Sequence, residues 1–141
     1  MAAQGIHHVS ITVTDFDRST AFYNKLFESL GAKPVMAVTG APHRDPEGRF
    51  TLYAGPGLMF GLWEASKENR QNKFDRYNVG LNHLAFAAPS REAIDELHRQ
   101  LVAQGATILD APAEYPYAPG YYAAFFADPD GIKLEYVHVP G

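Results

Sequence analysis

Residues 5–15 read GIHHVSITVTD and alternate between apolar and polar side chains. Successive side chains of a β-strand point to opposite faces of its sheet, so this alternation predicts a strand with one buried face. The face expected to be buried carries Val9, Ile11 and Val13. The other face carries an imidazole and two hydroxyls, from His8, Ser10 and Thr12, and offers them to whatever the sheet curves around.

The opening stretch recurs in the second half of the chain. GIHHVSITV and GLNHLAFAA share a glycine and a histidine, because Gly5 and His8 are followed 75 residues later by Gly80 and His83. A repeat of this length predicts two similar units, each too small to bury its own sheet face alone. We expect a single domain over residues 1–141, with module 1 at 5–64, a polar linker at 65–79 and module 2 at 80–139.

Each module is expected to follow the order β-α-β-β-β. Helices are predicted from an N-cap at Asp15 to a stop at Gly31, and over 89–103 with Ser90 at the cap, because apolar residues there recur at helical spacing. The other predicted strands cover residues 33–38, 50–53 and 58–63 in the first module, and 81–87, 107–109, 121–127 and 132–139 in the second. The segment 111–120, APAEYPYAPG, is too rich in proline for a helix and is predicted to be an extended flap.

Composition excludes several classes of function. The formal net charge is −4 and the chain has no cysteine, which removes disulfides, thiolate metal sites and a cysteine nucleophile. No basic stripe follows the sequence, so we expect no nucleic-acid partner. No apolar run approaches the ~20 residues of a membrane span, and we expect a protein of the cytoplasm without a membrane partner.

Three motifs together resemble one known superfamily. They are the pattern G-x-x-H-hydrophobic that opens each half, the helix sequence AFYNKLF, and DPDGIKLEYV near the C-terminus. They are similar to the vicinal oxygen chelate superfamily of glyoxalases, bleomycin-resistance proteins and extradiol dioxygenases. The resemblance covers nearly the whole chain and implies an α+β fold, in which two β-α-β-β-β modules form a curved mixed sheet around a cup-shaped cavity. It also implies a homodimer, with the modules paired within one chain or between chains.

The resemblance also implies metal ligands on the first and last strands of the modules. Carried over to this sequence, these positions are His8, His83 and Glu135. The fourth position falls on Gly61, which has no side chain, and the nearby Glu64 has the opposite strand parity. Two imidazoles and one carboxylate would leave open coordination positions on Fe, Mn, Ni, Co or Zn, and this donor set does not choose among these ions.

Strand parity also predicts residues that line the cup, and from there Ser10, Thr12, Trp63 and Phe125 are expected to touch a small-molecule substrate. Tyr121, which flanks the flap, is expected to touch it as well. The tyrosines that flank the flap are compatible with closure on an aromatic ligand and equally with packing of a loop. Where the fosfomycin-resistance members of the superfamily would have a serine and a tyrosine, this chain has Ala123 and Phe125, which argues against a phosphonate. Arg44 and Arg49 are expected on a solvated surface.

The sequence therefore leads to two main hypotheses of different classes, and to an accessory subunit that has lost catalysis as a weaker third. The first is a divalent-metal enzyme of the glyoxalase or dioxygenase type, with lyase, isomerase or dioxygenase chemistry on a small substrate whose oxygens bind the metal. The second is a metal-free protein of the bleomycin-resistance type that sequesters an aromatic or cationic small molecule. Neither hypothesis includes a named general base.

Overall fold

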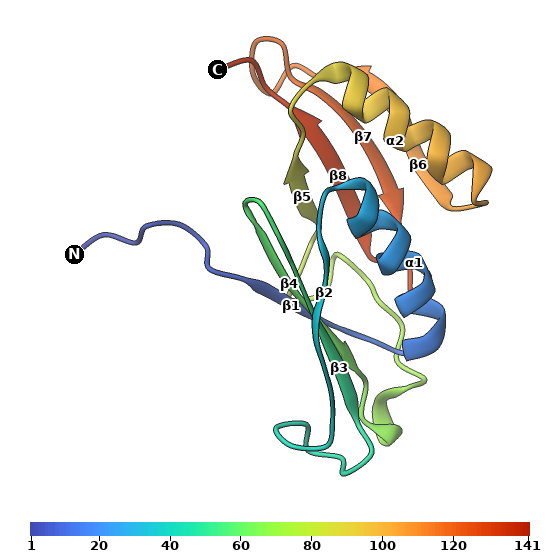
Figure 1. The fold of residues 1–141 in the computed structure, drawn as a ribbon. Helices are drawn as coiled ribbons and strands as arrows, with labels where there is room; N and C mark the ends of the chain where they lie inside the picture. The colour runs from blue at the N-terminus through green and yellow to red at the C-terminus, as the bar shows by residue number, and fades with distance from the viewer. The chain divides into compact units, whose positions relative to one another are not determined.

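The computed structural model describes all residues, 1–141, which form two compact units at Met1–Asn72 and Lys73–Gly141. The division lies inside the predicted linker. The first unit contains β1 (Val9–Val13), α1 (Phe16–Ser29), β2 (Lys33–Thr39), β3 (Arg49–Gly55), β4 (Leu58–Glu64) and the 3₁₀ turn η1 (Lys67–Asn69) (Figure 1). The second contains β5 (Leu84–Ala87), α2 (Arg91–Ala103), β6 (Thr107–Glu114), β7 (Tyr122–Ala127) and β8 (Lys133–His138). The predicted α+β fold, with β-α-β-β-β occurring twice, is confirmed.

Each unit builds one four-stranded mixed sheet with the same topology. The strand orders are β1-β4-β3-β2 and β5-β8-β7-β6. β1 pairs with β4 and β5 pairs with β8 in parallel, whereas the remaining pairs are antiparallel. The first strand of each unit therefore lies beside the last strand of the same unit, although the two are far apart in sequence.

The helix ends follow the local chemistry that the sequence predicts. The Asp15 carboxylate accepts a hydrogen bond from the backbone N–H of Arg18 at 3.1 Å, and the Ser90 hydroxyl accepts one from Ala93 at 3.2 Å. These caps satisfy N–H groups that have no partner within the helix. Gly31 follows α1 with φ of +83°, a left-handed conformation that glycine adopts without steric cost.

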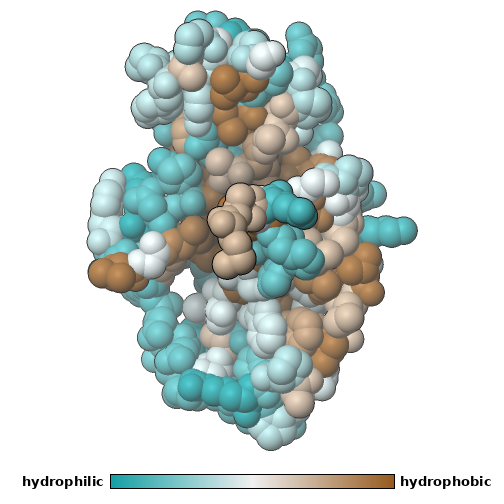
Figure 2. Space-filling model, turned by 90° about the vertical axis from the view of Figure 1, so that its left-hand side faces the viewer, coloured by the Kyte–Doolittle hydropathy of each residue, from teal (hydrophilic) through white to brown (hydrophobic).

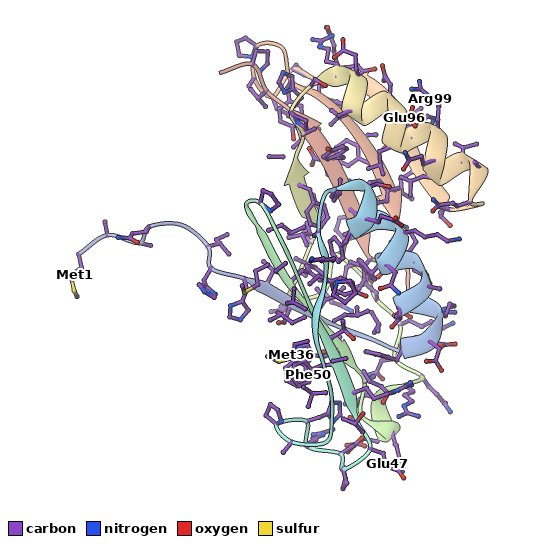
Figure 3. All side chains as sticks on the ribbon, viewed as in Figure 1. Met1, Met36, Glu47, Phe50, Glu96 and Arg99 are labelled. Atoms are coloured by element: carbon purple, nitrogen blue, oxygen red, sulfur yellow. The ribbon has the colours of Figure 1, made fainter.

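The core of the first unit lies between α1 and one face of its sheet. Phe27 is fully buried, and its ring centroid lies 4.8 Å from that of Tyr53 and 4.9 Å from that of Phe60. Ile11 and Val13 are buried as well, which confirms the predicted parity of β1. The opposite face of this sheet, away from α1, carries Met36 and Phe50 (Figure 3).

The second unit is packed in the same way. Ile94, Leu97 and Leu101 of α2 are buried, and α2 packs against β6, β7 and β8. Fully buried Phe126 and Leu134 are paired in the β7–β8 register. On the solvent side of α2, Glu96 and Arg99 form an exposed ion pair one helical turn apart (Figure 3).

Apolar residues also reach the surface, where Figure 2 shows them among hydrophilic ones. The exposed large side chains include Ile6 before β1, and Val35 and Met36 on the edge strand β2. No helix combines the length and the apolar character that crossing a bilayer requires.

Two predicted strands are shorter than the sequence suggested. β1 begins at Val9 and β5 at Leu84, so His8 and His83 each lie immediately before a strand and not within it. Ser10 and Thr12 are exposed, in agreement with the predicted parity.

The expected flap was partly wrong. β6 continues to Glu114 and so includes Pro112, which was assigned to the flap. The physical reason is that β6 is an edge strand with register shifts between Ile108 and Asp110 and between Asp110 and Ala113. Proline is tolerated at sheet edges and bulges because no ladder hydrogen bond is required of its nitrogen.

Replacing Tyr53 by Phe should change stability in a pH-dependent manner. The Tyr53 hydroxyl donates to Asn24 Oδ1 at 2.6 Å, and burial raises the pKa of Tyr53 to about 12. Near neutral pH, Tyr53→Phe should cost about 1 kcal/mol, the value of one hydrogen bond. The unfolded tyrosine ionises near pH ~10 while the folded one stays protonated, so wild-type stability falls as the pH rises from about 10 to about 12. Urea unfolding at several pH values should show the difference between the two proteins shrinking over this window; a constant difference would contradict the assignment.

Candidate metal and substrate site

The site in the second unit begins with the parallel pairing of β5 and β8. Ala85 lies opposite Glu135 in this register, and His83, two residues earlier, belongs to the same face. The resulting distance between His83 Nε2 and Glu135 Oε1 is 3.2 Å. The Glu135 side chain is 3% exposed, whereas that of His83 is 36% exposed. The pair therefore joins a buried carboxylate to an imidazole that reaches the surface.

Each member of the pair is held by a second polar group. His83 Nδ1 lies 2.7 Å from Asn82 Oδ1, an atom that only accepts hydrogen bonds. The Tyr121 hydroxyl donates to Glu135 Oε2. Burial, together with this hydrogen bond, raises the pKa of Tyr121, so the phenol remains a donor at neutral pH.

Both ring nitrogens of His83 face an acceptor oxygen, Asn82 Oδ1 at Nδ1 and Glu135 Oε1 at Nε2. A neutral imidazole carries one N–H, so it can donate to one of these oxygens and leaves a lone pair facing the other. When the N–H is on Nδ1, the lone pair of Nε2 faces the Glu135 carboxylate at 3.2 Å, and a proton or a cation between these two atoms removes the repulsion.

The separation also fits a shared metal ion. Two ligand atoms, each about 2.1 Å from one ion, lie about 3.0 Å apart at an octahedral angle and about 3.4 Å apart at a tetrahedral angle. The observed 3.2 Å falls between these values. A hydrogen-bonded imidazole and a hydrogen-bonded carboxylate are also the arrangement in which metal ligands are usually oriented.

Aromatic side chains surround Glu135. Phe125 pairs with Glu135 in the β7–β8 register, and its ring centroid lies 5.4 Å from that of Tyr115. Tyr115 and Tyr117 are stacked at 5.6 Å, and the amino group of Lys133 lies 4.6 Å from the centroid of Phe125. The side chains next to the buried Glu135 carboxylate are therefore mainly aromatic. The nearby cation, Lys133, already contacts the Phe125 ring.

The first unit presents a different constellation. His8 is exposed, and its Nδ1 lies 2.8 Å from Nδ1 of His7. Trp63 lies opposite Thr12 in the β1–β4 register and stacks on Phe50 at 4.3 Å with an interplanar angle of 9°.

Gly61 explains why the first unit has no counterpart of Glu135. A Cβ atom at this position would lie 2.4 Å from Ser10 Oγ and 3.1 Å from Trp63 Nε1. Ser10 and Trp63 thus occupy the space that a ligand side chain would need. Glu64, as predicted from its parity, belongs to the face that carries buried Phe60 and Leu62.

The predicted site residues therefore fall into two groups. His83, Glu135, Tyr121 and Phe125 come together in the second unit, and His8, Ser10, Thr12 and Trp63 belong to the first. Within the second unit no third His, Asp or Glu joins His83 and Glu135 in a group that could hold a metal ion. His8 stays a prediction for a third protein ligand.

Sequence reasoning missed several side chains near these positions. The first is Asn82. Its position could have indicated a contact with the predicted ligand His83, because its amide side chain directly precedes His83 in the sequence. The second is His43, in the loop before β3: its Nε2 lies 2.7 Å from the backbone oxygen of Glu64, and its ring lies 6.1 Å from that of Trp63. Contacts of this kind between a loop and a distant strand leave no local pattern in the sequence.

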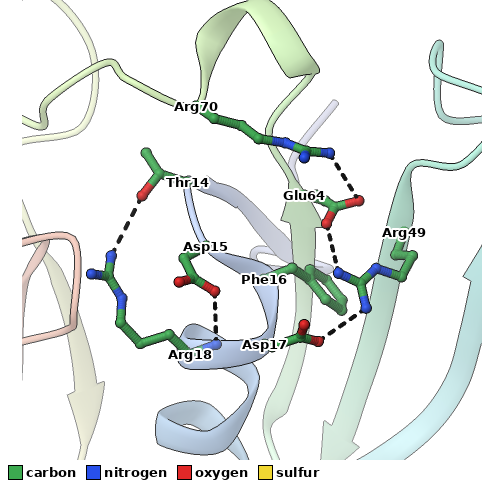
Figure 4. A pocket seen from close by; sticks show the side chains of 8 residues that line it. All are labelled: Thr14, Asp15, Phe16, Asp17, Arg18, Arg49, Glu64 and Arg70. Atoms are coloured by element: carbon green, nitrogen blue, oxygen red, sulfur yellow. Dashed lines mark hydrogen bonds and ion pairs between the residues drawn. The ribbon is translucent and has the colours of Figure 1, made fainter.

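A second feature of the first unit is an open polar cleft of about 490 Å³ at the start of α1 (Figure 4). Arg49, expected on a solvated surface, donates to Glu64 Oε2 at 2.8 Å and to Asp17 Oδ1 at 3.0 Å. Its hydrogen bond to Glu64 is the main cause that raises the pKa of Arg49. Arg70 lies 3.6 Å from the other oxygen of Glu64. The two arginines offset the cost of burying the Glu64 carboxylate, and they connect the start of the linker to β3 and β4.

Comparison with known proteins identifies the superfamily of this chain. The sequence profile of the glyoxalase/bleomycin resistance protein/dioxygenase superfamily matches residues 5–136, and the chain belongs to this superfamily. Bacillus subtilis YqjT is 31% identical over 134 residues, which cover 94% of this chain and 97% of YqjT. The metallothiol transferase FosB of Lysinibacillus sphaericus is 28% identical over 96% of this chain and 83% of its own.

Solved structures agree with this assignment. A glyoxylase/bleomycin resistance protein/dioxygenase domain from Frankia sp. EAN1pec has a TM-score of 0.81 and 28% identity, covering 99% of this chain and 94% of that one. The fosfomycin resistance protein FosX of Listeria monocytogenes, solved with Mn(II) and sulfate, has a TM-score of 0.67 and 20% identity, covering 99% of this chain and 95% of FosX. At this identity the likeness to FosX concerns the fold.

The ion pairs of the cleft can be tested by substitution. Arg49→Met should lower the free energy of unfolding by about 1–3 kcal/mol, because it leaves a largely buried carboxylate with the more distant Arg70 as its basic partner. Lys67→Met is the control, since Lys67 and its partner Glu47 are 68% and 84% exposed and such pairs contribute under about 1 kcal/mol. Urea unfolding measures both values, and equal losses would contradict the role given to Arg49.

Proposed function

We propose that this chain is a divalent-metal-dependent enzyme in which His8, His83 and Glu135 hold the ion and a small substrate binds to it through oxygen. The observation that carries the proposal is the 3.2 Å contact between His83 Nε2 and the buried Glu135 Oε1. The remaining polar atoms of the pair are also held, His83 Nδ1 by Asn82 and Glu135 Oε2 by Tyr121. FosX, a protein of the same fold, was solved with Mn(II), which supports a divalent ion without selecting Mn over Fe, Ni, Co or Zn.

The bound ion would act as a Lewis acid on a substrate oxygen or would activate water or dioxygen. In this proposal Glu135 supplies negative charge from a buried position, and Asn82 fixes the His83 tautomer that leaves Nε2 as the ligand atom. Phe125 and the flap tyrosines would exclude water from one side of the substrate. Lyase, isomerase and dioxygenase chemistry are all compatible with these roles.

The chain's own residues favour some substrates over others. Glu64 is engaged by Arg49 and Arg70, so it does not serve as a proton shuttle in this proposal. FosB is a metallothiol transferase, but beside Glu135 this chain has Ala123 and Phe125, and its Lys133 lies over the Phe125 ring. These side chains do not supply the several hydrogen-bond donors that usually hold a phosphonate dianion. We therefore propose a substrate without a phosphonate.

A second candidate function has an observation of its own. The same His83–Glu135 contact is satisfied by an imidazolium–carboxylate ion pair, and the cluster of Tyr115, Tyr117 and Phe125 offers an aromatic surface. In that case the protein would bind an aromatic or cationic small molecule without a metal. A homodimer is part of both proposals, and a partner copy could supply His8.

Metal content separates the two candidates. Protein purified without an affinity tag and dialysed against Mn(II), Fe(II), Co(II), Ni(II) or Zn(II) should retain about one ion per chain, as measured by elemental analysis. His83→Ala and Glu135→Gln should weaken binding by more than the ~10–100-fold typical of an outer-shell change, because each removes a direct ligand.

His98→Ala is the matched control, since His98 lies on α2 outside the site. It should keep the full metal content. Wild-type protein that retains none of the five ions, or His83→Ala protein that retains as much as His98→Ala, would overturn the metal proposal in favour of the binding protein.

A further inference from the structure

The two oxygens of Glu135 have different partners. Oε1 faces His83 Nε2 at 3.2 Å, whereas Oε2 accepts a hydrogen bond from the Tyr121 hydroxyl. The terminal torsion of a glutamate is broad, so an unrestrained carboxylate would exchange or share its oxygens. A donor fixed on one oxygen removes this freedom.

The Tyr121 side chain is itself held at the base of the flap. The backbone oxygen of Tyr121 accepts from the N–H of Tyr115 at 3.0 Å, and its own N–H donates to the oxygen of Ala118 at 3.1 Å. Its ring stands at 83° to that of Tyr117, with the centroids 5.2 Å apart. The hydroxyl is therefore aimed at Glu135 by both the backbone and the ring packing.

We propose that Tyr121 is a positioning residue that keeps Glu135 as a one-oxygen metal ligand, with Oε1 toward the ion and Oε2 engaged by the phenol. This inference rests on the proposed metal function. It gives Tyr121 a different role from the substrate contact expected from the sequence, because its hydroxyl is committed to Glu135. Glu135 would then leave the remaining coordination positions to the substrate.

The neighbouring tyrosine provides a matched control. Tyr122 also donates its hydroxyl to a carboxylate, Asp95 Oδ1, at 2.6 Å, but Asp95 belongs to α2 on the other face of the sheet. Tyr121→Phe and Tyr122→Phe therefore each remove one phenol–carboxylate hydrogen bond. Only the first of these bonds involves a proposed metal ligand.

The experiment compares Mn(II) and Co(II) dissociation constants of the wild type and both variants by isothermal titration calorimetry, with thermal unfolding of the metal-free proteins alongside. Tyr121→Phe should weaken binding by about 10–100-fold, the range typical for loss of a group that orients a ligand. Tyr122→Phe should change the dissociation constant by less than about 2-fold, although both variants lose a similar amount of stability. The visible spectrum of Co(II) should change in Tyr121→Phe alone, because Glu135 is then free to alter its coordination.

The possible outcomes distinguish failure of the positioning role of Tyr121 from failure of the proposed metal function. If wild-type protein binds neither ion, the proposed function and the role of Tyr121 both fail. If the wild type binds and Tyr121→Phe matches it in affinity and Co(II) spectrum, only the positioning role is overturned. Equal weakening in both variants would also overturn it, since that result indicates a general loss of stability.

Discussion

The parallel pairing of β5 with β8 brings together residues that lie about fifty positions apart, and the candidate site depends on it. The register sets Ala85 beside Glu135 and so puts His83 on the same face as the carboxylate. β8 is a central strand and Glu135 is buried, while β5 is an edge strand and His83 remains partly exposed. This combination puts a buried carboxylate next to an accessible imidazole, an arrangement that suits the proposed metal site.

The two units share a topology but differ at the position that matters for chemistry. Where the second unit has Glu135, the first has Gly61, packed against Ser10 and Trp63. The first unit instead carries the stacked Phe50 and Trp63 on the face that bears Ser10 and Thr12. The two units therefore share one scaffold, but at this position only the second has a carboxylate, and the first has an aromatic surface on the same face.

Much of the fold was predictable because it depends on local patterns. Both β-α-β-β-β units could be predicted from such patterns. These are the alternation in β1, the helix caps at Asp15 and Ser90, and the repeated glycines. That His83 and Glu135 belong to one site was implied by the superfamily resemblance, and the structure brings their side chains to 3.2 Å. The partners of Arg49, the loop contact of His43 and the hydrogen bond from Tyr121 to Glu135 were not predictable, since each joins groups from different elements through tertiary packing.

The most direct test of the account is a count of the imidazole ligands on the bound ion. Proton NMR of Co(II)-loaded protein with ¹⁵N-labelled histidine detects the exchangeable ring N–H of each ligated histidine as a strongly shifted signal. Two such signals are expected, of which one disappears in His8→Ala and the other in His83→Ala. A spectrum without shifted imidazole signals, or one that keeps both when His83 is replaced, would contradict the claim that His8 and His83 hold a metal ion together with Glu135.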